Sequence, residues 1–171
     1  IDKDVFARYT SDRPSWYYEV VAPGYKYNMT DIAASIGIHQ LKRAYDFQKK
    51  RESIAKFYSE NLFGLPLILP ATANAGDCHA WHLYVVRLAD SAAIERDSFI
   101  KEMFSNGIGC SVHFIPLHLH PYWRMKYKLL PEDFPEATQA FQKSISLPIF
   151  SKMTIEDCGK VVQTITSILK K

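Results

Sequence analysis

The chain has 171 residues, of which 47% are hydrophobic and 23% are charged, with a formal net charge of +3. This length and composition indicate a globular protein with a buried core, and the apolar runs are shorter than the roughly 18 to 20 residues of a transmembrane helix. With no signal-peptide pattern and no clustered basic stripe, we expect a cytoplasmic protein without membrane or nucleic-acid partners, whose mild positive charge suits a small anionic ligand.

A polar turn and a long helix are expected first. The turn PGYKYNM at residues 23–29 is followed by Thr30, a good helix cap, and by Asp31, whose charge suits the first turn of a helix. Apolar residues then recur at helical spacing, which predicts a helix over residues 30–62. Such a helix would be about 50 Å long, so we expect it to connect two bodies, with residues 1–29 ending the first and residues 63–171 forming the second.

Residues 63–171 are predicted to form a small α+β domain. The apolar patterns and breaker residues predict a short sheet whose one face is covered by helices. Thr154 and Asp157 match a capping box at the start of the last helix, whose apolar face would include Val161, Ile165 and Ile168. The first expected elements are a strand over 81–88, a helix over 95–106 stopped by Gly107, and a strand over 108–117. A loop rich in aromatic and basic residues over 118–137 follows, and then a helix over 135–143, a strand over 145–150 and the last helix.

No pattern of a self-contained active site is present. The sequence has no glycine-rich phosphate loop, no nucleophile elbow and no His-Glu-x-x-His motif. The histidine pairs 79/82 and 118/120 lack a third ligand nearby, so we expect no metal site. The three cysteines are far apart in sequence, which suits reduced thiols.

Three segments carry candidate ligand-binding residues. Lys26 and Asn28 precede a helix start, where unpaired backbone N–H groups attract anions, although an exposed capping turn is the alternative. His113 lies near the end of a predicted strand, where it either contacts a ligand or is satisfied by a neighbouring side chain. The segment Tyr122–Tyr127 is either a stacking surface for a base or a tethered lid.

Several blocks of the sequence together resemble one known family. In chain order they are PGYKYNMTDIAASIGIHQL, KKRESIAKFYSENL, HAWHLYVVRL, GIGCSVHFIPLHLHPYWR, FPEA and SLPIFSKMTIEDCGKVV. They resemble the C-terminal half of the DegT/DnrJ/EryC1/StrS aminotransferases, which depend on pyridoxal phosphate and act on nucleotide-linked keto sugars. The resemblance implies an α/β protein, the C-terminal part of a fold type I aminotransferase. A long interdomain helix would join the large cofactor domain to a small α+β domain.

The resemblance also implies roles for five residues. Lys26 and Asn28 are the expected cofactor-binding residues, on a turn that reaches the cofactor phosphate or the sugar of the partner subunit; many relatives carry Asn-x-Arg there. Tyr25, His113 and Phe114 are the expected substrate-binding residues. Phe114 stands where many relatives carry tyrosine, so a hydroxyl contact is lost.

The family's Schiff-base lysine has no counterpart in this chain. None of Lys26, Lys42, Lys49 and Lys101 lies in the sequence context that the family lysine requires. We therefore assign no catalytic residue, expect pyridoxal 5'-phosphate to be held mainly by an upstream domain, and expect this chain alone to be inactive.

The activity implied by the resemblance is amino transfer in a homodimer whose active sites lie at the subunit interface. The expected amino donor is glutamate, and the expected acceptor is a nucleotide-linked keto sugar such as a UDP- or dTDP-4-keto-6-deoxyhexose, for cell-surface glycan synthesis. Two alternatives stay open: a non-catalytic relative that binds a sugar nucleotide or a regulatory partner, and a stand-alone interaction domain.

Overall fold

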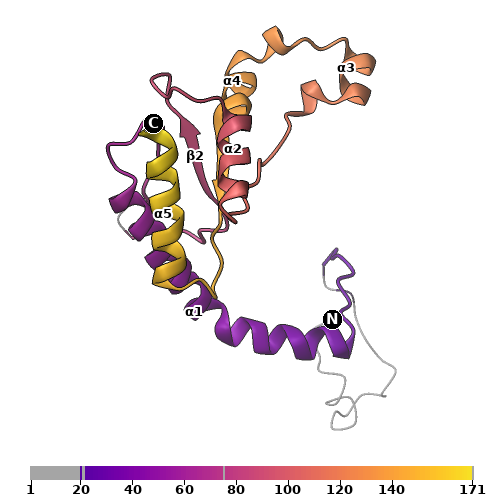
Figure 1. Cartoon of the computed structure of the whole chain (residues 1–171). Helices are drawn as coiled ribbons and strands as arrows, with labels where there is room; N and C mark the ends of the chain where they lie inside the picture. Colours follow the sequence, from indigo (N-terminus) through magenta and orange to yellow (C-terminus); the bar gives the residue numbers. More distant parts are fainter. Residues whose placement is uncertain (1–19, 21, 75, 171) are drawn as a thin grey trace, which may run out of the picture. The chain divides into compact units, whose positions relative to one another are not determined.

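The computed structural model describes residues 20, 22–74 and 76–170 of the chain (Figure 1). The chain divides into two compact units that meet in sequence between Gln40 and Leu41, and each unit is considered by itself. The described residues of the first unit are the turn before the long helix and the first turns of that helix. The second unit holds the sheet and the other described helices. Most of residues 1–29, predicted as the end of a large domain, lie outside the described residues.

Helix α1 spans Asp31–Asn61, which is within one residue of the predicted helix at each end. The Thr30 side chain accepts a hydrogen bond from the backbone N–H of Ala33 at 3.3 Å, so the predicted cap is confirmed. In the second unit this helix buries Ile54, Ala55 and Tyr58. Within the described residues, no helix combines the length and the apolarity needed to cross a membrane.

Three short strands form one antiparallel sheet in the order β1-β2-β3. The central strand β2 begins later than predicted because Trp81 has a φ of 45°, which is incompatible with an extended strand. Strand β3 ends before Pro148, which has no N–H group for a sheet hydrogen bond. The strand bounds are Leu67–Ile68 for β1, Tyr84–Leu88 for β2 and Ser144–Leu147 for β3.

The remaining predicted helices are confirmed. Gly107 has a φ of 74° just after α2, which is the left-handed stop that the sequence predicts. At α5 the capping box is present, because Thr154 accepts from the Asp157 N–H at 3.1 Å and its own N–H donates to the Asp157 carboxylate at 2.8 Å. The bounds are Arg96–Ser105 for α2, Pro135–Lys143 for α4 and Ile155–Leu169 for α5.

The hydrophobic core of the second unit lies on one face of the sheet. Alternation along β2 and β3 places Tyr84 opposite Leu147 and Val86 opposite Ile145 on this face. Helices α1, α2 and α5 supply the rest of the core, and the fully buried Tyr58 donates its hydroxyl hydrogen to the Pro148 carbonyl at 2.9 Å. The helix residues in the core are Ile54, Ala55, Tyr58, Phe99, Met103, Cys158, Val161, Ile165 and Ile168. An α/β fold with helices on a short sheet is therefore confirmed.

The predictions between α2 and α4 are wrong in two places. The predicted strand over 108–117 meets the sheet only at a bridge between Ser111 and Ser146, and Pro116 cannot donate to a ladder. The predicted loop over 118–137 contains most of a short 3-10 helix η2, all of helix α3, the 3-10 helix η3 and the first turn of α4 (Figure 1). Helix α3 buries no residue, so it leaves no apolar periodicity in the sequence. The bounds are Leu117–Leu119 for η2, Pro121–Tyr127 for α3 and Pro131–Asp133 for η3.

Candidate functional site

His113 lies on the sheet face opposite the hydrophobic core. The bridge consists of two backbone hydrogen bonds, from the Ser111 N–H to the Ser146 carbonyl at 3.2 Å and from the Ser146 N–H to the Ser111 carbonyl at 2.7 Å. Ser146 sits between two core residues of β3, so its side chain points to the opposite face. There its hydroxyl lies 2.8 Å from Nδ1 of His113. The segment that carries His113 is thus held against β3 by backbone and side-chain hydrogen bonds.

The neighbour of His113, Phe114, is 75% exposed. Its ring meets the His113 ring edge-on, with 4.6 Å between the centroids and an interplanar angle of 89°. The peptide bond between the two residues is cis. The sequence leaves open whether His113 is satisfied by a neighbouring side chain or contacts a ligand. The structure provides a neighbouring side chain, Ser146, as the partner of Nδ1. Within the described residues, Nε2 of His113 makes no hydrogen bond.

The two later histidines of this segment have structural partners. His118 is buried and stacks on Phe134, and its Nε2 lies 2.8 Å from the Thr138 hydroxyl. His120 directs Nε2 at the Ile115 carbonyl at 3.2 Å. Among the residues that the structure describes, no group of three or more histidine, cysteine, aspartate or glutamate side chains is placed to hold a metal ion.

Cys110 is the thiol nearest to this segment in sequence. Burial raises the pKa of the Cys110 thiol to about 11. The thiol is therefore protonated at neutral pH and is not an activated nucleophile.

The aromatic and basic residues of α3 order one another. The rings of Trp123 and Tyr127 stack at 5.8 Å with an interplanar angle of 8°. The Lys126 ammonium lies over the Tyr122 and Tyr127 rings and donates to the Tyr122 hydroxyl at 3.1 Å. These contacts stay within one helix, and Tyr122, Trp123 and Tyr127 all stay exposed to solvent.

Lys26, Asn28 and Tyr25 belong to the first unit and precede α1. All three are exposed, and the Tyr25 and Tyr27 rings lie 5.7 Å apart. Within the described residues, neither Lys26 nor Asn28 is held by an intramolecular hydrogen bond or ion pair. An ammonium and an amide that are free to donate suit a phosphate group, so the donor set here fits the phosphate of pyridoxal phosphate.

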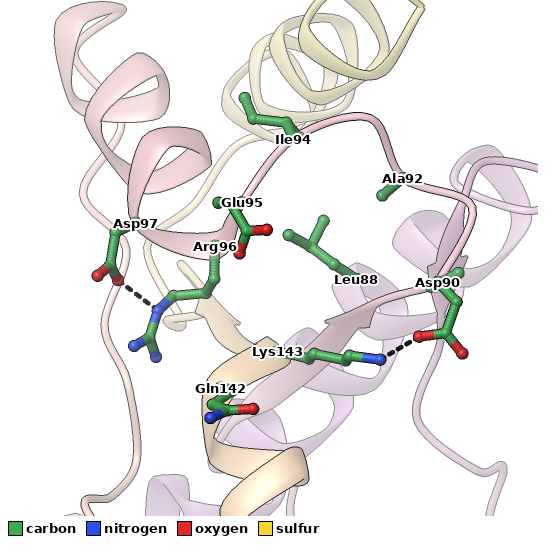
Figure 2. Close-up of a pocket in the computed structure, with 10 residues that line it drawn as sticks. Leu88, Asp90, Ala92, Ile94, Glu95, Arg96, Asp97, Gln142 and Lys143 are labelled. Carbon is green, nitrogen blue, oxygen red and sulfur yellow. Dashed lines mark hydrogen bonds and ion pairs between the residues drawn. The ribbon is translucent and has the colours of Figure 1, made fainter.

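A hollow of about 530 Å³ lies in the second unit between the end of β2, the start of α2 and the end of α4 (Figure 2). Lys143 forms an ion pair with Asp90 there, which holds the pKa of the Asp90 carboxyl below its usual value. Arg96 pairs with Asp97 at 2.5 Å and donates to the Phe141 carbonyl at 3.0 Å. The sequence predicts no site residue in this hollow, and its basic groups are already paired.

The sequence gives no indication of the two residues that bind the ring nitrogens of His113 and His118. Ser146 and Thr138 are ordinary strand and helix residues by pattern, and each becomes relevant through a histidine partner distant in sequence. Only the register of the chain against β3 and the packing of η2 on α4 bring these pairs together.

The chain matches one protein-family model and closely similar proteins over nearly its whole length. Residues 3–166 match the model of the DegT/DnrJ/EryC1/StrS aminotransferase family. The chain is 47% identical to the uncharacterized protein MJ1066 of Methanocaldococcus jannaschii, which matches 100% of this chain and 44% of that protein. It is 39% identical to the spore coat polysaccharide biosynthesis protein SpsC of Bacillus subtilis, over 99% of this chain and 44% of SpsC.

A solved structure shares the fold. The putative sugar aminotransferase Spr1654 of Streptococcus pneumoniae, in its PMP form, superposes with a TM-score of 0.78 and 30% identity over 98% of this chain and 41% of that one. The chain therefore spans less than half the length of each of these three relatives, and its fold is that of the C-terminal part of a fold type I aminotransferase. With a family model matched across nearly all of its residues, the chain belongs to the DegT/DnrJ/EryC1/StrS aminotransferase family.

Proposed function

We propose that this chain is the C-terminal part of a pyridoxal-phosphate-dependent enzyme that transfers an amino group to a sugar. The observation that carries the proposal is the family match over residues 3–166. The likeness to Spr1654, a putative sugar aminotransferase solved in PLP and PMP forms, supports it.

The residues of this chain would bind and orient the reactants. Pyridoxal phosphate, when bound, supplies the chemistry that carries the amino group between donor and acceptor. Lys26 and Asn28 would donate hydrogen bonds to its phosphate, since both are exposed and have no partner among the described residues. His113, Phe114 and Tyr25 would contact the sugar substrate. No residue of this chain is assigned a catalytic role.

The domain organisation follows from the same proposal. Helix α1 would connect an upstream cofactor domain, which supplies the cofactor lysine and ends within residues 1–29, to the small domain of residues 63–171. The exposed apolar residues Ile32 and Ile36 on the first part of α1 support a contact with protein outside the described residues. Two such subunits would form a homodimer with the active sites at their interface.

The substrate and setting are further parts of the proposal. We propose a nucleotide-linked keto sugar, such as a UDP- or dTDP-4-keto-6-deoxyhexose, as acceptor and glutamate as donor, in the cytoplasm. The name of SpsC, which refers to spore coat polysaccharide biosynthesis, supports a role in cell-surface glycan synthesis.

The test is a transaminase assay on the full-length protein. The purified protein is incubated with pyridoxal phosphate, glutamate and a panel of UDP- and dTDP-keto sugars, and the release of 2-oxoglutarate and of the amino sugar is measured. We expect turnover of at least one keto sugar. Binding of a sugar nucleotide without turnover, in a protein that takes up no cofactor, would instead identify a non-catalytic relative.

A further inference from the structure

Ser146 has a buried hydroxyl group with one hydrogen-bond partner. The residue is 4% exposed, and its oxygen lies 2.8 Å from Nδ1 of His113. Either atom is able to donate in this pair, depending on the ring tautomer. Within the described part of the chain, the Ser146 side chain makes no other hydrogen bond. Its single hydrogen therefore has His113 as its available acceptor.

The two neutral tautomers of His113 differ in whether Nδ1 can accept the hydrogen of the Ser146 hydroxyl group. If Nδ1 carried the hydrogen and donated to Ser146, the serine hydrogen would be buried without an acceptor, which costs about 1–3 kcal/mol. If Ser146 donates to Nδ1, both groups are satisfied and the imidazole hydrogen lies on Nε2. We infer that Ser146 holds neutral His113 in the Nε2–H tautomer, so that His113 presents a hydrogen-bond donor to its ligand.

His118 and His120 also carry their hydrogen on Nε2, because of the groups that their Nε2 atoms face. They serve as internal references for His113. Thr138 donates its hydroxyl hydrogen to the Pro131 carbonyl at 3.0 Å, so it accepts from Nε2 of His118. A carbonyl only accepts, so Nε2 of His120 donates to Ile115. Both donors are used inside the protein. Among the described residues, the Nε2–H of His113 alone of these three has no protein acceptor, which leaves it for a ligand.

The identity of that ligand rests on the proposed function. An N–H donor recognises an oxygen, so His113 would contact a hydroxyl, keto or phosphate oxygen of the sugar substrate and would not take a proton from it at Nε2. Ser146 is then a positioning residue. It touches no substrate, and it fixes the orientation and the tautomer of a residue that does.

The tautomer is measured by NMR on the 171-residue chain labelled with ¹⁵N in histidine, at a pH well above the usual histidine range near 6.5. A His113→Asn variant assigns the His113 signals. We expect Nε2 of His113 to be protonated and Nδ1 to be unprotonated in the wild-type chain. Ser146→Ala is expected to give a mixture of tautomers at His113 and to leave His120 unchanged.

A wild-type His113 with the hydrogen on Nδ1 overturns the inference, whether or not Ser146→Ala folds. An unchanged His113 tautomer in a folded Ser146→Ala chain overturns it as well. This experiment needs neither cofactor nor turnover. A full-length protein without transaminase activity would therefore refute the proposed function and leave the tautomer result standing.

Kinetics of the full-length enzyme test the link to substrate. Ser146→Ala is expected to raise the KM for the keto sugar about 2- to 10-fold with little change in kcat, as for the loss of one hydrogen bond. Ser146→Thr, which keeps the hydroxyl, is expected to restore the wild-type KM. An unchanged KM in a Ser146→Ala enzyme whose His113 tautomer is mixed would refute the contact between His113 and the substrate.

Discussion

At the residue scale, the anion-binding role proposed for Lys26 and Asn28 is open to direct test. Both side chains are exposed before α1 and are free to donate to a phosphate. In the full-length protein, Lys26→Ala with Asn28→Ala is expected to raise the Kd for pyridoxal phosphate about tenfold or more, because a hydrogen bond to a charged group is worth about 1.5–3 kcal/mol. The measurement is cofactor titration by absorbance. Lys42→Ala, an exposed lysine on α1, is the matched control, and unchanged cofactor and substrate affinity in the double variant would refute the role.

A second residue-scale prediction concerns the hydrogen bond that joins η2 to α4. Buried His118 donates to the Thr138 hydroxyl, which in turn donates to the Pro131 carbonyl. Thr138→Val keeps the side-chain shape and leaves the His118 N–H without an acceptor, so we expect a loss of about 1–3 kcal/mol in the free energy of unfolding. Urea denaturation measures this loss. Thr138→Ser keeps the hydroxyl and should lose much less, and equal losses in the two variants would contradict the assignment.

At the element scale, the start of α5 depends on its capping box. Hydrogen bonds from Thr154 hold the pKa of the Asp157 carboxyl below its usual value. Because the folded pKa is lowered, this contribution to stability is fully present above the unfolded aspartate pKa and is lost as the pH falls through the folded pKa. Thr154→Ala is expected to reduce the free energy of unfolding by about 1 kcal/mol at neutral pH. As the pH falls, the free energy of unfolding of this variant should decrease less than that of the wild-type chain.

The control for this prediction is Ser167→Ala, which removes an exposed hydroxyl from the same helix. It should leave both the stability and its pH dependence unchanged. Unfolding measured from neutral pH to about pH 3 distinguishes the two variants. If both gave the same acid profile, the capping box would not be the source of the effect.

The elements also show why the sequence predicts some segments and not others. Helices α1, α2, α4 and α5 carry local signals: caps at the starts of α1 and α5, a stop glycine after α2, a proline in the first turn of α4 and a clear apolar face in α5. The segment 108–117 reads as a strand because its residues favour extended backbone, but whether it pairs depends on β3, which is distant in sequence. For the same reason His113 is a visible candidate from the sequence, whereas its partner Ser146 is visible only in the structure.

At the scale of the whole molecule, the apolar residues of α1 divide into two groups. Ile32 and Ile36 are 76% and 58% exposed, whereas Ile54 is 3% exposed and belongs to the core of the second unit. If α1 connects this chain to an upstream cofactor domain, the first group is covered only in the full-length protein. The two groups should therefore respond differently to substitution in the two forms of the protein.

Ile32→Glu with Ile36→Glu is expected to leave the unfolding of the 171-residue chain almost unchanged, because surface substitutions usually alter stability by less than about 0.5 kcal/mol. In the full-length protein the same pair would bury two charges without partners, so we expect a lowered melting temperature and loss of bound pyridoxal phosphate. Ile54→Ala should instead destabilise both forms, by about 2–5 kcal/mol, because it opens a cavity in the core. Thermal unfolding of both forms provides the comparison. Equal tolerance of the glutamate pair in both would mean that the first part of α1 faces solvent in the full-length protein, which would remove the connecting role proposed for it.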